Sequence, residues 1–172
     1  MTTTIVLMGV AGAGKTTVMA ELAGRLGWAV AEGDDFHSPA NVARMRVGQP
    51  LTDEDRLPWL RALAAWIGER EAAGESALVS CSALKRAHRD LLRAGHGSVW
   101  FVHLVAPPTT LAARLDSRRG HYMPSTLLAS QLASLERLAP DEPGVAVSSD
   151  DSLEGVVEEI LGLLAARRAA VP

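Results

Sequence analysis

The sequence predicts an α/β fold in which helices cover both faces of a parallel β-sheet. Short apolar runs alternate with longer amphipathic ones, a glycine-rich loop follows the first apolar run, and 172 residues suffice for a domain with a sizeable core. Strand–helix alternation favours parallel pairing. We therefore expect one domain over residues 1–172, with the loops after the strands gathered at one sheet edge, where ligands bind.

The strands are predicted from short runs of apolar residues that are bounded by glycine or polar residues. The run TIVLMG begins the series, and SVWFVHLV is its clearest buried member. The predicted strands are residues 4–9, 28–31, 77–81, 98–105 and 145–147.

The helices are predicted from apolar spacing of three or four and from capping residues. Ser38 before Pro39 indicates one helix start and Thr52 another, while Asp151 with Glu154 resembles a capping box at the last helix. The predicted helices are residues 15–26, 39–48, 52–73, 85–94, 109–119, 125–138 and a final one from 151.

Composition and charge exclude several classes of protein. The formal net charge of −3 gives no electrostatic footprint for nucleic acid. No apolar run approaches the roughly 18 residues of a membrane span, and the short run Ile5–Met8 lacks the basic flank of a signal peptide. The single cysteine, Cys81, excludes an internal disulfide, and we expect it to be a buried small residue. These observations predict a cytoplasmic protein without nucleic-acid or membrane partners.

A phosphate-binding loop lies between the first predicted strand and the first predicted helix. Gly9-x-x-x-x-Gly14-Lys15-Thr16 fits the Walker A pattern in the context that the pattern requires. Its backbone N–H groups and the helix N-terminus surround phosphates, Lys15 reaches the β- and γ-phosphates, and Thr16 ligates magnesium. The predicted ATP-binding residues are Gly9, Val10, Ala11, Gly12, Ala13, Gly14, Lys15, Thr16 and Thr17.

The rest of the chain favours a small-molecule kinase over a switch or a motor. No guanine-binding Asn-Lys-x-Asp segment occurs, and the segment Asp141–Gly144 is a turn that lies too late to be a switch. The third and fourth predicted strands end without the acidic residue of a motor ATPase. The acidic residues follow the second strand instead, which places a carboxylate on the acceptor's side of the γ-phosphate.

The segment after the second strand supplies the candidate acceptor-binding acid. Asp34 is the predicted base, which orients the acceptor hydroxyl and takes its proton. Glu32 is a candidate to hold magnesium through water. His37 could hydrogen-bond a hydroxyl of a polyol. For Asp35, capping of the following helix is an equally good explanation.

Basic residues follow that could bind a substrate carboxylate. Arginine forms two parallel charge-assisted hydrogen bonds with a carboxylate. Arg44, Arg46 and Arg56 lie in the segment that should cover the acceptor, and Arg56 is the best candidate because of its dense polar-to-aromatic surroundings. Lys85 stands at a helix start, where the dipole disfavours a cation, which suggests a non-structural role.

A last basic group indicates a lid. Arg114 and Arg118 are four residues apart and share a helix face, and Gly120 resembles a helix stop before His121. Two such arginines near the phosphates would close over the site, exclude water and neutralise charge during transfer. A solvated helix face explains the spacing equally well.

Taken together, these segments resemble the gluconokinase family of small P-loop carbohydrate kinases. The resemblance runs in order from about Ile5 to about Ile160, and its second and third segments are the specific ones. The segments are LMGVAGAGKTT, EGDDFHSPANVARMRVGQPLTDEDRLPWL, VSCSALKRAHRDLLR, LAARLDSRRGHYMPSTLLASQLASLE and SLEGVVEEI.

The resemblance implies ATP- and Mg²⁺-dependent phosphorylation of D-gluconate on its terminal hydroxyl, giving 6-phospho-D-gluconate. It implies a three-layer α/β/α fold similar to shikimate kinase and adenylate kinase, with a five-stranded parallel sheet and a helical lid. Family members are commonly cytoplasmic homodimers. We expect residues 34–75 to bind the acceptor and residues 114–126 to form the lid.

Carried over residue by residue, the resemblance implies a full set of site residues. Departures are mild: Ala11 and Ala13 stand where relatives often have Ser, and Tyr122 replaces a frequent Phe. The expected catalytic residues are Lys15, Asp34 and Arg118; Arg114 joins the nucleotide-binding set; the substrate-binding residues are Asp34, His37, Arg44, Arg56, Lys85 and His121; the metal ligands are Thr16 and Glu32.

Two alternatives remain open at this point. The first is a P-loop kinase that acts on another small acceptor, such as shikimate or a nucleoside monophosphate, and a panel of acceptors would separate these. The second is a non-catalytic nucleotide-binding regulator, which would bind ATP without phosphorylating anything, although Asp34 and the lid arginines argue against it.

Overall fold

Five parallel strands form the centre of the molecule in a computed structural model that describes residues 2–117 and 126–170. The strand order is β2-β3-β1-β4-β5, and every neighbouring pair is parallel, so the predicted sheet is confirmed. The strands are β1 (Thr4–Met8), β2 (Ala29–Glu32), β3 (Ala77–Ser80), β4 (Val99–Val105) and β5 (Gly144–Ser148).

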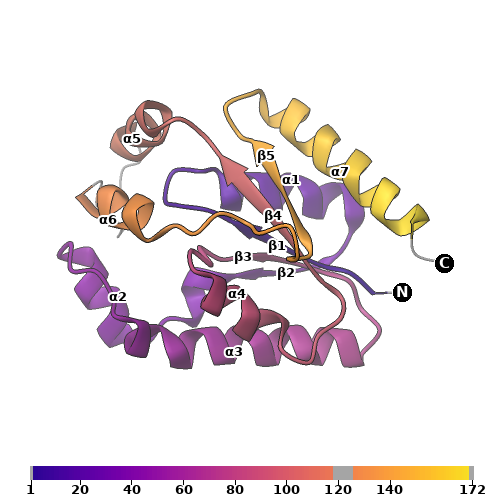
Figure 1. The fold of residues 1–172 in the computed structure, drawn as a ribbon, viewed down its shortest axis with the longest axis horizontal. Coiled ribbons are helices and arrows are strands. Elements are labelled where there is room, and N and C mark those ends of the chain that lie inside the picture. Colours follow the sequence, from indigo (N-terminus) through magenta and orange to yellow (C-terminus); the bar gives the residue numbers. More distant parts are fainter. Residues whose placement is uncertain (1, 118–125, 171–172) are drawn as a thin grey trace.

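Helices cover both faces of this sheet, as predicted, and make a three-layer α/β/α fold (Figure 1). Figure 1 shows α1 and α7 on one side of the sheet and α3 with α4 on the other. The helices are α1 (Lys15–Leu26), α2 (Pro39–Arg46), α3 (Asp53–Ala72), α4 (Arg86–Arg93), α5 (Pro108–Ser117), α6 (Thr126–Ser134) and α7 (Leu153–Ala169), and a 3₁₀ turn, η1, spans Gly33–Phe36.

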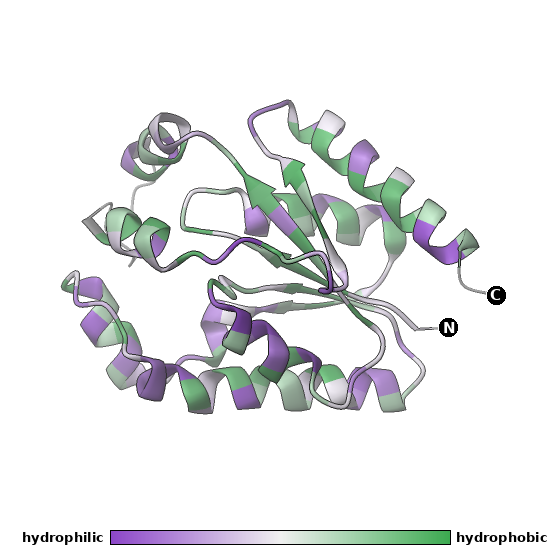
Figure 2. Cartoon of the chain, in the orientation of Figure 1, coloured by the Kyte–Doolittle hydropathy of each residue, from purple (hydrophilic) through white to green (hydrophobic). Residues whose placement is uncertain are grey.

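Strand β1 divides the hydrophobic core in two because successive side chains of a strand point to opposite faces. Ile5 and Leu7 pack in a cluster with residues of α1 and α7, whereas Val6 and Met8 pack with residues of α3 and α4. The four side chains are completely buried. Figure 2 shows the strands largely in the hydrophobic colour, with polar residues on the outer faces of the helices.

Two predicted element boundaries were wrong. The helix predicted over 125–138 ends at Ser134, because the next residues leave the helix to bond elsewhere: Glu136 N donates to Leu84 O at 2.8 Å. The final helix is capped by Ser152, whose hydroxyl accepts from Gly155 N at 3.1 Å, and not by Asp151. The predicted cap at Thr52 is confirmed, with a capping box that Asp55 completes.

The carboxyl ends of the strands lie at the left of Figure 1, where α2, α5 and α6 gather, and both termini lie at the right. The loops after β1, β2 and β3 therefore meet at one edge, as the topology predicts. Within residues 2–117 and 126–170, no helix combines the length and apolar character needed to cross a bilayer.

Candidate active site

The loop between β1 and α1 has the conformation of a phosphate cradle. Gly9 and Gly12 have φ of 139° and 83°, which side-chain-bearing residues rarely adopt. A Cβ atom at Gly9 would lie 2.8 Å from Leu104 O, and one at Gly12 would lie 2.8 Å from Leu111 O. Glycine is therefore required at both positions for the loop to fold against its neighbours.

The predicted phosphate and metal residues lie together at the start of α1. Lys15 Nζ donates to the carbonyls of Gly9 and Val10 at 3.0 and 3.1 Å, so the ammonium lies over the loop. Thr16 Oγ1 donates to Glu32 Oε2 at 2.7 Å, and the Ser80 hydroxyl donates to the other oxygen of Glu32. The structure thus brings together Thr16 and Glu32, which the sequence predicted as the metal pair.

This donor set fits magnesium. Mg²⁺ usually takes one or two protein oxygens and fills its remaining positions with water and substrate phosphates. The Thr16 hydroxyl and the Glu32 carboxylate provide such oxygens beside the loop. Among the side chains that the structure describes, no group of three or more His, Cys, Asp or Glu residues could form a complete protein cage for a metal.

One pocket joins the phosphate loop to the predicted acceptor residues. Asp34, in η1, lines this pocket together with Lys15, Thr16 and Arg56. Ser82, Met45 and Leu51 also line this pocket. A phosphate held by the loop and a hydroxyl held by Asp34 would therefore share one space.

His37 forms a wall of this pocket by stacking on Trp59. The two ring centroids are 4.1 Å apart with planes 20° from parallel, and Trp59 Nε1 donates to Gly33 O at 2.7 Å. Burial, with Arg56 nearby, lowers the pKa of His37 to about 4, although Asp34 acts in the opposite direction. His37 is consequently neutral at pH 7 and suited to a hydrogen bond with a hydroxyl.

Arg56 and Lys85, two of the predicted substrate-binding residues, meet at one acidic side chain, Asp53. Lys85 Nζ contacts the two carboxylate oxygens of Asp53 at 2.7 and 3.0 Å, and Arg56 Nη1 lies 3.8 Å from Oδ1. Only 16% of the Arg56 side chain is exposed, and its burial lowers the pKa of the guanidinium. Asp53 is thus shared by both cations, and of the two only Arg56 is among the residues that line the pocket.

Arg44 stands apart from this group. Its Nη1 contacts Asp55 Oδ2 at 2.7 Å, and the same carboxylate accepts from Thr52 N at the start of α3. In this structure Arg44 therefore braces the cap of α3, and its role as a substrate ligand remains a prediction.

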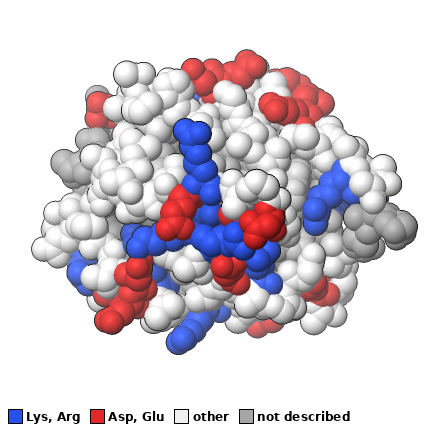
Figure 3. All heavy atoms as spheres, viewed as in Figure 1, with Lys and Arg blue, Asp and Glu red and all other residues white. Residues whose placement is uncertain are grey.

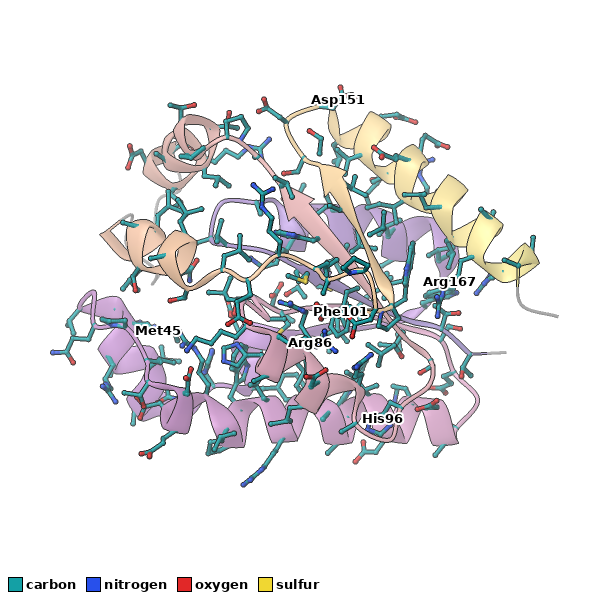
Figure 4. The ribbon with its side chains drawn as sticks, in the orientation of Figure 1. Met45, Arg86, His96, Phe101, Asp151 and Arg167 are labelled. Carbon is teal, nitrogen blue, oxygen red and sulfur yellow. The ribbon has the colours of Figure 1, made fainter. Side chains whose placement is uncertain are left out.

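Arg114 bridges the phosphate loop to the loop after β5. Its Nη1 donates to Gly12 O at 3.4 Å and its Nη2 to Ser149 O at 2.6 Å. Gly14, Thr17 and Arg114 line a second pocket with Ser149 and Asp151, and Figure 4 labels Asp151 in the turn before α7. This pocket lies where a nucleoside attached to the bound phosphates could extend.

Two predicted lid residues, Arg118 and His121, lie outside the described residues, as does Tyr122. Their assignments stay predictions. The helix that carries Arg114 is described up to Ser117, and α6 begins at Thr126.

Sequence reasoning missed three contributors to the site. Gln131 Oε1, on α6, accepts from Ala11 N at 2.7 Å, and Ser82 O accepts from Gly9 N at 3.2 Å. Trp59 is buried and lines the acceptor pocket. The one available signal was a glutamine within an otherwise apolar helix stripe, since backbone contacts such as that of Ser82 leave no trace in residue type.

Cys81, next to these contacts, is buried as predicted. It follows β3 directly and is 1% exposed, and burial raises the pKa of its thiol to about 12. A neutral thiol is a poor nucleophile, which agrees with a packing role.

Comparisons with known proteins agree with this architecture. Residues 5–140 match the family model described as an AAA domain. The gluconokinase of Gluconobacter oxydans (strain 621H) is 50% identical over 157 residues, which cover 91% of this chain and 88% of that protein.

Solved structures give the same relationship. A sugar kinase from Janibacter sp. HTCC2649 superposes with a TM-score of 0.92 at 49% identity, covering 96% of this chain and 95% of that one. A gluconokinase from Sinorhizobium meliloti 1021 superposes with a TM-score of 0.82 at 46% identity, covering 95% and 91%. Shikimate kinase from Aquifex aeolicus shares the fold, with a TM-score of 0.68 at 16% identity over 96% and 98%.

Proposed function

This chain belongs to the gluconokinase family, and from that premise we propose that it transfers the γ-phosphate of ATP to the terminal hydroxyl of D-gluconate. The product is 6-phospho-D-gluconate. The observation that carries the proposal is the single pocket in which Lys15, Thr16, Asp34 and Arg56 face one another.

In the proposed reaction the residues around the phosphate loop hold the donor. The loop amides and Lys15 bind the β- and γ-phosphates, and Arg114 lies beside the nucleoside. Thr16 and, through water, Glu32 would hold Mg²⁺, which neutralises charge on the transferring group when it is bound. The bond between the γ-phosphorus and the bridging oxygen breaks as the hydroxyl oxygen bonds to phosphorus.

The acceptor side supplies orientation and a proton acceptor. Asp34 hydrogen-bonds the terminal hydroxyl and takes its proton as the new bond forms. Neutral His37 binds another hydroxyl, and Arg56, which shares Asp53 with Lys85, attracts the gluconate carboxylate. We assign acceptor binding to residues 34–75 and closure of the site to residues 114–126, with Arg118 and His121 as lid residues.

Other acceptors are less well matched to this pocket. A nucleoside monophosphate needs a second phosphate site and a base-binding surface, whereas the acceptor end here offers Met45, Leu51 and Trp59 beside one cationic group. The likeness to shikimate kinase extends to the fold alone. An acid with several hydroxyls fits the charge and the hydrogen-bonding groups best.

A coupled assay of ADP release across a panel of acceptors tests the proposal. Gluconate, shikimate and nucleoside monophosphates would be compared at equal concentration, with Mg²⁺ and with excess chelator. We expect turnover with gluconate that is abolished by chelation. Equal or faster turnover of a different acceptor would overturn the assignment, and ATP binding without turnover of any acceptor would favour a regulator.

We also propose a cytoplasmic homodimer. An apolar groove between the β4–β5 half of the sheet and helices α5 and α6 supports an interface there; Val105, Leu132 and Leu138 line it, and Val105 is 43% exposed. Sedimentation should show a dimer that Val105→Glu dissociates, whereas Val30→Glu, at a 50% exposed site on the opposite edge strand, should not. A monomeric wild-type protein at micromolar concentration would reject this part of the proposal.

A further inference from the structure

A buried arginine on α4, which the proposed reaction does not use, holds the loop that follows β3. Arg89 is completely buried, and its Nε and Nη2 contact the two oxygens of Glu142 at 2.5 and 2.9 Å. Its Nη1 donates to Ala83 O at 3.1 Å and Leu84 O at 3.3 Å. A buried guanidinium with a bidentate carboxylate and further carbonyl acceptors is a rigid anchor.

The same guanidinium also fixes the segment that leads from α6 to β5. Nη1 donates to Glu136 O at 3.1 Å, and Nη2 donates to Arg137 O at 3.4 Å. Arg89 therefore joins the loop after β3 to the segment after α6. Figure 3 shows acidic and basic side chains intermixed over α4 in this region, where Arg86 pairs with Asp90 and Asp141 on the surface.

The loop that Arg89 holds contains an unfavourable backbone conformation. Ala83 has φ of 41°, and in the described part of the chain it is the one residue other than glycine with positive φ. A left-handed conformation is unfavourable for alanine and persists only where surrounding contacts impose it. The hydrogen bond from Arg89 to the Ala83 carbonyl is such a contact.

Residues on both sides of Ala83 in the sequence make contacts at the candidate site. On one side, Ser82 O accepts from Gly9 N of the phosphate loop at 3.2 Å. On the other side, Lys85 contacts the carboxylate of Asp53, which also lies near Arg56. A relaxed backbone at Ala83 would therefore misdirect Lys85 relative to Arg56.

We propose that Arg89 is a positioning residue of the acceptor site, which acts by imposing the left-handed conformation of Ala83 and so aiming Lys85 and Ser82. The inference rests on the proposed function for its readout, which is gluconate phosphorylation. It predicts that Arg89 is no longer required for gluconate binding when residue 83 is a glycine, which adopts positive φ without strain.

The test is a rescue experiment with Arg89→Lys, Ala83→Gly and the double variant. We expect Arg89→Lys to raise the KM for gluconate about tenfold, the effect of one or two lost charge-assisted hydrogen bonds, with the KM for ATP within about twofold of wild type. Ala83→Gly alone should leave both constants near wild type, because glycine accepts positive φ. The double variant should recover most of the gluconate KM.

A merely structural role predicts a different pattern. Arg89→Lys would then lower the melting temperature and the active fraction at an unchanged gluconate KM, and Ala83→Gly would lower stability further, since it removes a buried methyl group. An unchanged KM in folded Arg89→Lys, or no rescue by glycine, overturns the proposal. Arg86→Lys on the same helix is the matched control, and its gluconate KM should not change.

Failure of the inference remains distinguishable from failure of the proposed function. Wild-type protein that does not phosphorylate gluconate rejects the function, whereas active wild type without rescue rejects only the role of Arg89. If Arg89→Lys does not fold, Glu142→Gln replaces it, because it weakens the same anchor with little change in size. The same rescue by Ala83→Gly is expected, and its absence counts against the proposal.

Discussion

The donor and acceptor sides of the candidate active site are built in different ways. The phosphate loop is a run of consecutive residues whose backbone does the binding, and glycine sterics fix its shape. The acceptor side is assembled from η1, the start of α3 and the loop after β3, and ion pairs hold it together. Local sequence therefore determines the first, whereas tertiary packing determines the second. The two sides should fail separately when they are mutated.

The largest expected effect is on kcat and comes from a change at Asp34, which lines the pocket between the donor and acceptor sides. Asp34→Asn should lower kcat by about 10²- to 10⁴-fold, because it removes the proton acceptor, while ATP affinity stays nearly unchanged. Steady-state kinetics and ATP titration measure both. Asp35→Asn, at the exposed neighbouring position, is the control and should retain activity. Near-wild-type turnover of Asp34→Asn would remove Asp34 as the base.

A second change should affect only the acceptor side. Arg56→Ala should raise the KM for gluconate by about 10- to 100-fold through loss of a charge-assisted pair, with little change for ATP. Arg44→Ala provides the contrast: because Arg44 braces the α3 cap through Asp55, it should lower the melting temperature more than it alters KM. An unchanged gluconate KM for Arg56→Ala would make Arg56 a structural residue.

A third change should affect only the donor side. Arg114→Ala removes hydrogen bonds to Gly12 O and Ser149 O and should raise the KM for ATP about fivefold, with the gluconate KM unchanged. A parallel rise in both constants would show that the two sides are coupled through this residue.

The smallest effect concerns pH. Burial is the main cause that lowers the pKa of both His37 and His103 to about 4, from the ordinary histidine value of 6.5. The unfolded chain therefore binds more protons between these values, so stability is full above pH 6.5 and falls as pH decreases toward 4. Thermal unfolding across this range measures it.

Substitution of each histidine shows whether the pH dependence arises at the acceptor pocket or elsewhere in the fold. His37→Gln and His103→Gln should each flatten the decrease in melting temperature between pH 6.5 and 4. Only His37→Gln should also raise the gluconate KM, since His37 lines the acceptor pocket. A decrease that is as steep in the double variant as in the wild type would place the titrating groups elsewhere.

The same contrast explains how much the sequence could predict. The strands, most helices and the phosphate loop followed from periodicity and spacing. Thr16 and Glu32 were each proposed as a metal ligand, but their direct hydrogen bond was not predicted. The end of α6 did not, because Leu84 O captures Glu136 N across the fold. The meeting of Lys85 with Arg56 at Asp53 also depends on packing between α3 and the loop after β3.

The apolar contact that closes the acceptor end could not be foreseen either. Met45, Leu51 and Leu127 form a small cluster between the acceptor segment and α6, and Figure 4 labels Met45 on the inner side of α2. A single sequence gives no evidence that residues so far apart in the chain are in contact. Their hydrophobic character is compatible with any position in the core.

The order of the strands has a consequence for how such enzymes can diversify. Strand β3 lies between β1 and β2, so the strands that lead into the phosphate loop and into Asp34 are two strand spacings, about 10 Å, apart. The sheet acts as a fixed spacer between the donor loop and the acid that receives the acceptor. Because backbone hydrogen bonds set that width, evolution can change the covering segments for new acceptors without altering the reach of the transferred phosphate.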